Sequence, residues 1–258
     1  MEFIKANLIN TTTQISVTNN TALSSNLFNR DSFYQYYTDS LNSDLVTGTI
    51  TITFGATTNV SRIALMDTNL KGFDVYYNGA TANAFTLVNQ NTTTSKFTGN
   101  TDSNLLLRFA TIAVSSITID MKTTQTANQE KVLGLLFISD LLYTLGKVPN
   151  SSGYKPKSVP KQIVHTLSGG GTRINNVRKN FDLAINLDYM SESEVTSLRS
   201  VYDLGGAFNF AAFGTSTGWT NPVFFEAVWP GSFDFYEYSD DAISSGFSGQ
   251  IKLKETPI

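Results

Sequence analysis

The sequence predicts an all-β protein of two domains, and three observations support this prediction. The chain has 258 residues, which is enough for two ordinary domains with buried cores. Only 15% of the residues are charged, and the abundant Asn, Thr and Ser suit strand faces and turns better than exposed helices. Short apolar runs separated by turn residues recur along the chain. We expect an N-terminal β-sandwich and a small C-terminal β-sandwich or barrel with one flanking helix.

The clearest strand of the first half is GTITITFG, residues 48–55. Threonine alternates there with isoleucine or phenylalanine between two glycines, so one face is predicted to be buried and the other to meet water. Further strand-like runs are 60–66, 72–77, 84–89, 105–109, 115–121 and 132–138. Strands this short, at this spacing, are typical of a sandwich or barrel.

A linker is predicted at residues 146–160, GKVPNSSGYKPKSVP, which gather three prolines and two glycines and show no apolar period. This places one domain at 1–145 and the other at 161–258.

The second half contains one convincing helix, predicted at 191–204. Ser191 and Glu194 have the spacing of a capping box, Met190 and Val195 can form a hydrophobic staple, and a Gly-Gly pair follows the helix. Strands are predicted around it at 162–167, 181–187, 207–213, 223–229, 232–238 and 249–254.

Charge and cysteine content restrict the partners and the chemistry. The net charge of −3 divides evenly, with 9 basic and 10 acidic residues in 1–150 and 9 and 11 in 151–258, so we expect no nucleic-acid partner. The absence of cysteine excludes disulfides and thiolate chemistry. The first residues lack the pattern of a signal peptide, and no apolar run reaches 18 residues, so we expect neither secretion nor membrane insertion.

The first half resembles the discoidin, or coagulation factor C-domain, family of galactose-binding-like jelly-roll sandwiches. The resemblance lies in ITFG, VSRIALMD and FDVYYNG between residues 51 and 79, and in the later runs AVSSITIDMKTT and KVLGLLFISD. In that family, the segment before the first long strand helps to form the ligand mouth. Here that segment has neither the tryptophan nor the Asp-Gly pair of the family pattern.

The segment at this position is NLFNRDSFYQYYTDS, residues 26–40. Tyrosine rings offer flat apolar faces with polar tips, and the Asn-Arg-Asp group could supply convergent hydrogen bonds. The candidate ligand residues are Asn29, Arg30, Asp31, Tyr34, Tyr36 and Tyr37. The alternative is that the aromatic residues plug the end of the sandwich or face another protein, while Arg30 and Asp31 pair locally.

The second half is similar to the tail-tube-like domains of bacteriophage tail and baseplate proteins, in which a small sandwich or barrel with one flanking helix assembles side by side into rings. The similarity lies in the order of elements, from a strand and Gly-rich turn to the closing SGFSGQIKLKE. It implies a homo-oligomer that contacts other virion tail proteins.

The residues that could carry catalysis have structural explanations. His165, the only histidine, shares a predicted strand face with Ile163 and Leu167, and no G-x-S-x-G motif accompanies it. The run SGGGTR, residues 168–173, lacks the lysine and helix of a phosphate-binding loop and reads as a hairpin turn. Asp234 and Glu237 are three residues apart and would point to opposite faces of a strand.

One candidate for an ion is left open. A single histidine without cysteine cannot make an ordinary zinc site. Calcium needs only oxygen ligands, and Asp67 and Asn69 lie in a loop that could hold it, although Asx residues in turns usually bond their own backbone. No other cofactor is indicated.

From these observations we expect a non-enzymatic structural component of a bacteriophage or prophage-derived tail or baseplate, located in the virion. Its discoidin-like domain would contact proteins or host-surface glycans. The alternative is a carbohydrate-binding module protein or adhesin. A third possibility is a glycosidase with paired carboxylates, which composition alone does not exclude.

Overall fold

The protein is described by a computed structural model, and the all-β fold class is confirmed. The structure describes residues 1–31, 33–39, 42–88, 92–146, 154–166, 172–212, 224–240 and 244–256. The chain divides into two compact units. The N-terminal sandwich comprises Ile4–Leu141 with Ala211–Val223, and the C-terminal unit comprises Met1–Phe3, Leu142–Phe210 and Phe224–Ile258. In the described residues, no helix is both long and apolar enough to cross a membrane.

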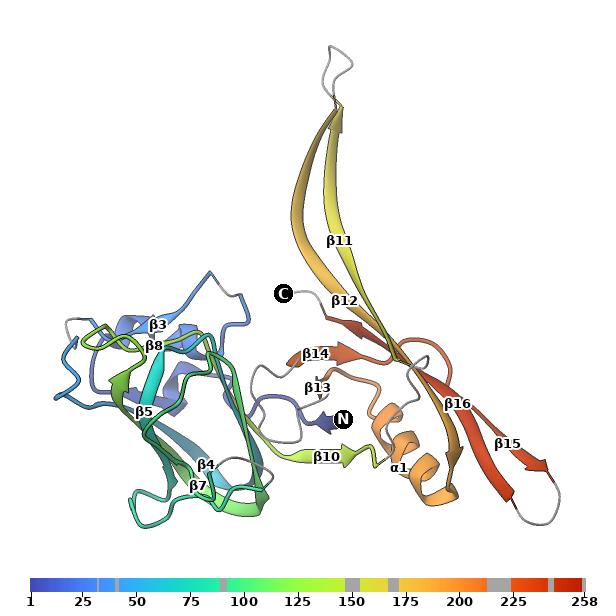
Figure 1. The fold of residues 1–258 in the computed structure, drawn as a ribbon, viewed down its shortest axis with the longest axis horizontal. Coiled ribbons are helices and arrows are strands. Elements are labelled where there is room, and N and C mark those ends of the chain that lie inside the picture. The colour runs from blue at the N-terminus through green and yellow to red at the C-terminus, as the bar shows by residue number, and fades with distance from the viewer. Residues whose placement is uncertain are drawn as a thin grey trace. The chain divides into compact units, whose positions relative to one another are not determined.

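The N-terminal sandwich is built on one six-stranded antiparallel sheet and one two-stranded sheet (Figure 1). Its elements are η1 (Thr12–Gln14), β2 (Ile15–Val17), η2 (Thr21–Phe28), β3 (Tyr36–Tyr37), β4 (Gly48–Met66), β5 (Leu70–Tyr77), β6 (Lys96–Phe97), β7 (Leu105–Thr124), β8 (Val132–Leu133) and β9 (Leu135–Ser139). The larger sheet has the order β2-β4-β7-β5-β6, with β9 also paired to β4, and β3 pairs with β8.

Strand β4 shows why this unit has a single dense core. From Ile50 to Phe54 buried and partly or fully exposed residues alternate, as the sequence predicts, and from 60 to 65 every residue is buried. Between these stretches residues 55–57 and Asn59 are exposed, and the pairing with β7 shifts register between Thr53 and Thr58. The predicted strands 48–55 and 60–66 are therefore two parts of one long strand, and the β-branched Thr57 and Thr58 between them favour extended backbone.

Four other predicted strands of this unit have different limits in the structure. Runs 105–109 and 115–121 also merge, into β7, whereas 132–138 divides into β8 and β9. Of the run 84–89, residues 84–88 are described and form isolated bridges at Ala84, Thr86 and Leu87, whereas residue 89 lies outside the described residues.

The C-terminal unit contains an eight-stranded sheet and one helix (Figure 1). Its elements are β1 (Glu2–Ile4), β10 (Leu141–Thr144), β11 (Tyr154–Thr166), β12 (Thr172–Met190), α1 (Glu192–Tyr202), β13 (Phe208–Ala211), β14 (Phe224–Val228), β15 (Asp234–Asp240) and β16 (Ser244–Glu255). The strand order is β10-β1-β13-β14-β16-β12-β11, and β15 pairs with β16.

Helix α1 begins as predicted. The Ser191 hydroxyl accepts a hydrogen bond from the Glu194 amide at 3.3 Å, and the Glu194 carboxylate accepts one from the Ser191 amide at 2.8 Å. This capping box satisfies two backbone donors that the helix itself leaves free. Leu198 and Val201 are the buried helical residues.

The domain limits differ from the predicted ones at both ends. Residues 1–3, expected in the N-terminal domain, belong to the C-terminal unit, where β1 lies between β10 and β13. The fully buried Phe3 ring packs 5.6 Å from Phe208 and 5.3 Å from Phe210, between ring centroids. Residues 142–145 belong to this unit as well.

Part of the predicted linker is a strand. Residues 154–160 form the first half of β11, whereas 147–153 lie outside the described residues. Pro156 and Pro160 led to the linker prediction, yet β11 is the last strand of its sheet. Proline is tolerated in an edge strand because the N–H that it lacks is not needed for pairing on the open side.

Candidate functional site

The loop after η2 is shaped by its own Asx side chains. The Asn29 side-chain oxygen accepts a hydrogen bond from the Asp31 amide at 3.0 Å, and the Asp31 carboxylate accepts one from the Phe33 amide at 3.1 Å. The Asn26 side chain also donates to the Gln35 carbonyl at 3.0 Å. Asn29 and Asp31, predicted to contact a ligand, therefore hold the turn in place, and Arg30 beside them is partly buried.

Tyr36 is in the core, which corrects its prediction as a ligand residue. Its side chain is fully buried, and its hydroxyl donates a hydrogen bond to the Asn19 carbonyl at 2.8 Å. Burial raises the pKa of Tyr36 to about 12. The cause is strand alternation: in β3, Tyr36 points inward and Tyr37 outward, and the letters YY do not reveal which is which.

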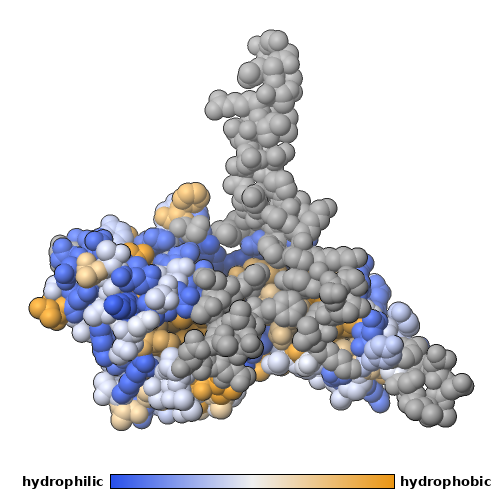
Figure 2. Space-filling view, in the orientation of Figure 1, coloured by the Kyte–Doolittle hydropathy of each residue, from blue (hydrophilic) through white to orange (hydrophobic). Residues whose placement is uncertain are grey.

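The remaining aromatic residues of this segment are on the surface. Phe33 is 92% exposed, Tyr34 54% and Tyr37 41%. The next loop carries Leu45, 96% exposed, and Val46, 43% exposed. We call these five residues the loop surface. Figure 2 shows hydrophobic residues on the face of this unit turned to the viewer.

A buried lysine ties together the two loops that carry the loop surface. Lys131 is fully buried, its backbone amide donates to the Thr38 hydroxyl at 2.9 Å, and its ammonium donates to the Ser43 carbonyl at 3.1 Å. Burial lowers the pKa of Lys131, although the Asp44 carboxylate opposes this shift. No sequence pattern marked this lysine, because its partners are about 90 residues away in the chain.

Asp44 fixes the second loop from the other side. Its carboxylate accepts hydrogen bonds from the amide and the hydroxyl of Thr124, both at 3.1 Å, while its own amide donates to the Asn128 side chain. Burial alone would raise the pKa of Asp44, but these hydrogen bonds and Lys131 lower it overall. Both loops are thus anchored to the segment 124–131.

In the loop that was predicted to hold an ion, the Asn69 side chain makes hydrogen bonds within the protein. The Asn69 side chain accepts a hydrogen bond from the Val132 amide at 2.9 Å and donates to the Glu130 carbonyl at 2.7 Å. Asp67 adopts a positive φ of 52°, and its backbone amide donates a hydrogen bond to the Asn104 side-chain oxygen at 2.8 Å. Among the residues that the structure describes, no three metal-ligating side chains gather at one place.

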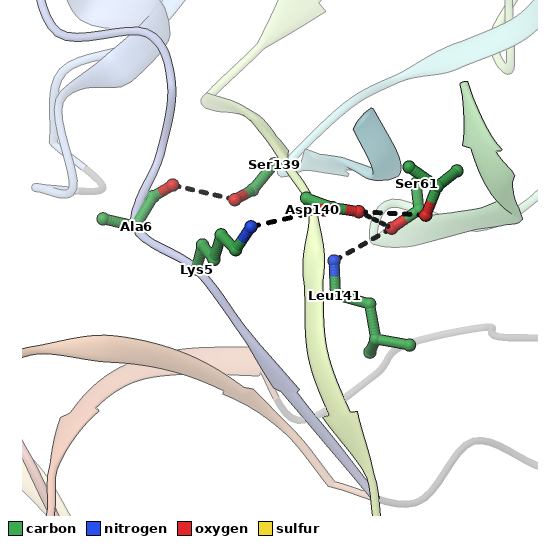
Figure 3. Close-up of polar contacts among 7 residues, drawn as sticks. Lys5, Ala6, Ser61, Ser139, Asp140 and Leu141 are labelled. Atoms are coloured by element: carbon green, nitrogen blue, oxygen red, sulfur yellow. Dashed lines mark hydrogen bonds and ion pairs between the residues drawn. The ribbon is translucent and has the colours of Figure 1, made fainter. Parts of the chain in front are cut away.

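The polar cluster around Asp140 holds four segments of the sandwich together (Figure 3). Its carboxylate accepts hydrogen bonds from Ser61 at 2.7 Å and Thr111 at 3.2 Å, and it pairs with Lys5 at 3.4 Å. Burial would raise the pKa of Asp140, but the Ser61 hydroxyl and the charge of Lys5 hold it below its ordinary value. The cluster joins the end of β9 to β4, β7 and the N-terminal segment, which is a structural role.

The C-terminal unit contains a pocket of about 330 Å³ beside the end of α1. Tyr202 and Trp229 form part of its wall, with ring centroids 5.5 Å apart, and the Tyr202 hydroxyl donates to the Gly231 carbonyl at 2.7 Å. Asp203 is its charged lining residue.

The other residues considered for chemistry are placed as follows. Asp234 and Glu237 are both exposed on β15. His165 lies in β11, where only the backbone is described, and residues 168–171 lie outside the described residues. The strands on either side of that Gly-rich run pair directly with each other from Thr166 and Thr172 onward, as in a hairpin.

Comparison with known proteins gives likenesses in structure only. No protein-family model matches the chain, and no curated protein matches it. One similar solved structure is a point mutant of chitosan-binding module 1 from a chitosanase/glucanase of Paenibacillus sp. IK-5, with a TM-score of 0.40 and 10% identity, covering 54% of this chain and 99% of that one. CBM32-3 from a family 31 glycoside hydrolase of Clostridium perfringens has a TM-score of 0.36 and 14% identity, covering 50% and 92%. The lectin domain of lectinolysin, complexed with Lewis B antigen, has a TM-score of 0.36 and 16% identity, covering 49% and 92%.

Proposed function

We propose that this chain is a non-catalytic binding protein whose N-terminal sandwich recognises a carbohydrate through Phe33, Tyr34 and Tyr37. The observation that carries the proposal is the exposure of three aromatic rings within five residues, on a loop fixed by internal hydrogen bonds. Aromatic faces bury the apolar C–H face of a sugar ring, and tyrosine hydroxyls meet its polar edge.

The scaffold under these rings favours binding by a surface that is already formed. Buried Tyr36 and Lys131 fix both ends of the segment that holds Tyr37, so little backbone order has to be gained when a ligand binds. The rings lie on the surface and not in a deep cavity. We therefore expect a dissociation constant of about millimolar or somewhat tighter, which corresponds to roughly −4 to −6 kcal/mol.

A glycan array followed by calorimetric titration tests this proposal. We expect the intact chain to bind at least one oligosaccharide, and Tyr34→Ala and Tyr37→Ala each to weaken binding about tenfold. Tyr236→Ala is the matched control, because Tyr236 is a tyrosine that is 65% exposed on the C-terminal unit. Equal losses in all three variants, or no glycan bound at all, would contradict the proposal.

A second candidate is a role in assembly, as a tail or baseplate component located in a virion. It is favoured by Leu45 and Val46, whose exposed aliphatic side chains suit a protein surface better than a sugar. In this case the loop surface would contact another tail protein. Leu45→Ser would then abolish incorporation into particles while glycan binding remained intact, and electron microscopy with mass spectrometry of purified particles would measure this.

A further inference from the structure

The pocket beside the end of α1 is made by the C-terminal unit, to which all the described residues that line it belong. Its volume of about 330 Å³ is at the lower end of the range for pockets that hold small molecules. Buried Val201 and Phe208 supply apolar wall, and Gly205 and Gly206 supply backbone without side chains. The space is therefore sufficient for a small organic ligand.

Two aromatic rings of the pocket wall stand nearly at a right angle. The ring planes of Tyr202 and Trp229 are 81° apart, and their centroids are separated by 5.5 Å. The hydrogen bond from the Tyr202 hydroxyl to the Gly231 carbonyl fixes the first of these rings. We call the two rings the aromatic corner. Aromatic faces carry negative potential and attract cations, so this wall is suited to a positively charged group.

The aromatic cluster behind this corner already contacts one cation of the protein. Phe233 packs against both rings, with its centroid 5.5 Å from that of Tyr202 and 5.6 Å from that of Trp229. The Arg199 guanidinium lies over Phe233, 4.5 Å from the ring centroid. Arg199 would repel a second cation, but it is exposed, so water and salt screen its charge.

The Asp203 carboxylate in the pocket lining is available to a ligand. Asp203 is exposed, and within the described part of the chain its side chain makes no hydrogen bond or ion pair, including with Arg199 four residues earlier. It follows the last residue of α1, where the helix dipole adds partial negative charge. A carboxylate at this end of a helix is unfavourable for folding, and a bound cation would offset that cost.

Trp229 adds a hydrogen-bond donor without an acceptor. The residue is 9% exposed, and its indole N–H has no hydrogen-bond partner among the residues that the structure describes. A buried indole N–H ordinarily donates to an oxygen atom. A ligand that carries a hydroxyl group would supply this oxygen.

We propose that this pocket binds a small organic cation that carries a hydroxyl group. The ammonium group lies between the aromatic corner and the Asp203 carboxylate, and the hydroxyl oxygen accepts a hydrogen bond from the Trp229 indole. This inference is independent of carbohydrate binding by the exposed rings of the N-terminal sandwich, because it uses only the C-terminal unit.

Calorimetric titration with choline tests the proposal, because choline combines a quaternary ammonium group with one hydroxyl. The matched neutral compound has a tert-butyl group in place of the trimethylammonium group. We expect choline to bind the intact chain with a dissociation constant of about one millimolar, and the neutral compound to bind about tenfold more weakly. Trp219→Phe leaves Trp229 as the only tryptophan, so fluorescence of this variant should change as choline is added.

Asp203→Asn should weaken choline binding about tenfold and remove most of the preference over the neutral compound. Circular dichroism verifies that the variant is folded. Glu192→Gln is the matched control, because Glu192 is an exposed acidic residue at the other end of the same helix, roughly 16 Å away. This control should bind choline like the unmodified chain. Tyr37→Ala should do so as well, which separates this site from the proposed carbohydrate site.

Three results would overturn the proposal. They are equal binding of choline and the neutral compound, equal losses in Asp203→Asn and Glu192→Gln, and the absence of any heat of binding at about 50 mM choline, well above the expected dissociation constant. A saccharide that changes the fluorescence of Trp229 when choline does not would overturn it in favour of a neutral ligand.

Discussion

Strand β4 of the N-terminal sandwich and strand β12 of the C-terminal unit are both 19 residues long, but they are covered differently. β4 contains one charged residue, Arg62, and has neighbours on both edges at each of its two ends. β12 contains five charged residues, and its first ten residues have one paired neighbour. The difference teaches that strands of equal length can be covered differently: apolar β4 lies within a core and is paired on both edges, whereas the more charged β12 is paired with β11 alone along its first ten residues.

The largest effect should come from opening the core of the sandwich. Phe85 is fully buried, with its ring centroid 4.1 Å from that of Phe109. Phe85→Ala should lower the free energy of unfolding by about 3–5 kcal/mol, because a cavity replaces the ring. Phe33→Ala, at an exposed ring, should change it by less than about 0.5 kcal/mol. Urea denaturation measures both, and similar effects would mean that Phe33 is not a surface residue.

A smaller effect is expected in the C-terminal unit, where β15 and β16 approach closely. A Cβ atom added to Gly249 would lie 2.5 Å from the Asp234 carbonyl oxygen and 2.5 Å from the Phe235 ring. Gly249→Ala should destabilise this unit by about 1–3 kcal/mol. Gly55→Ala is the control, because a Cβ there meets nothing within 4 Å. Thermal melting should show a lower transition only for the Gly249 variant.

The next effect concerns Asp140 and pH. Asp140→Asn weakens hydrogen bonds from Ser61 and Thr111 and should cost about 1–2 kcal/mol at neutral pH. Because the pKa of Asp140 is lowered on folding, its contribution is present above the ordinary value of 3.8 and is lost as the pH falls through the folded pKa. As the pH falls from neutral to about 3, the difference in the free energy of unfolding between Asp140→Asn and the wild type should therefore become smaller, and denaturation at a series of pH values measures it. A difference in the free energy of unfolding that does not change with pH would contradict the claim that Asp140 is ionised in the folded protein.

The smallest effect separates the two neighbouring tyrosines. Tyr36→Phe removes a buried hydrogen bond to the Asn19 carbonyl and should cost about 1 kcal/mol, whereas Tyr37→Phe should leave stability unchanged. The raised pKa of Tyr36 gives a second readout. Its contribution to stability is present below pH 10 and is lost as the pH rises through about 12. Burial also raises the pKa of Tyr76 and Tyr143, so ultraviolet titration should show several late-ionising phenolates, of which the one with a pKa of about 12 is missing in the Tyr36 variant.

Local patterns predicted the parts of the fold that depend on local physics. Alternating Thr and Ile gave β4 its buried face, and the Ser191 and Glu194 spacing gave the start of α1. The place of residues 1–3 could not be predicted in this way, because β1 is three residues long and the β10 residues beside it lie about 140 residues away. A strand of three residues is too short to show an alternation of apolar and polar residues in the sequence.

The sequence predicted which segment carries the candidate site, but it did not predict which side chains of that segment are exposed. Tyr34 and Tyr37 are exposed as expected, but Tyr36 belongs to the core, and Asn29 and Asp31 form the turn. Phe33 and Leu45, the most exposed of the large apolar residues whose burial the structure describes, were not among the predicted ligand residues. Apolar residues are usually assigned to a core from sequence, so exposure of this kind becomes visible only once neighbouring loops are placed.

Hydrogen exchange, measured by mass spectrometry with and without a saturating oligosaccharide selected from the glycan array, tests the central claim most directly. The claim is that Phe33, Tyr34 and Tyr37 bind carbohydrate. We predict slower exchange in peptides covering residues 26–39, with no change in β5 or in β16. Protection confined to the C-terminal unit, or exchange that no glycan alters, would contradict it.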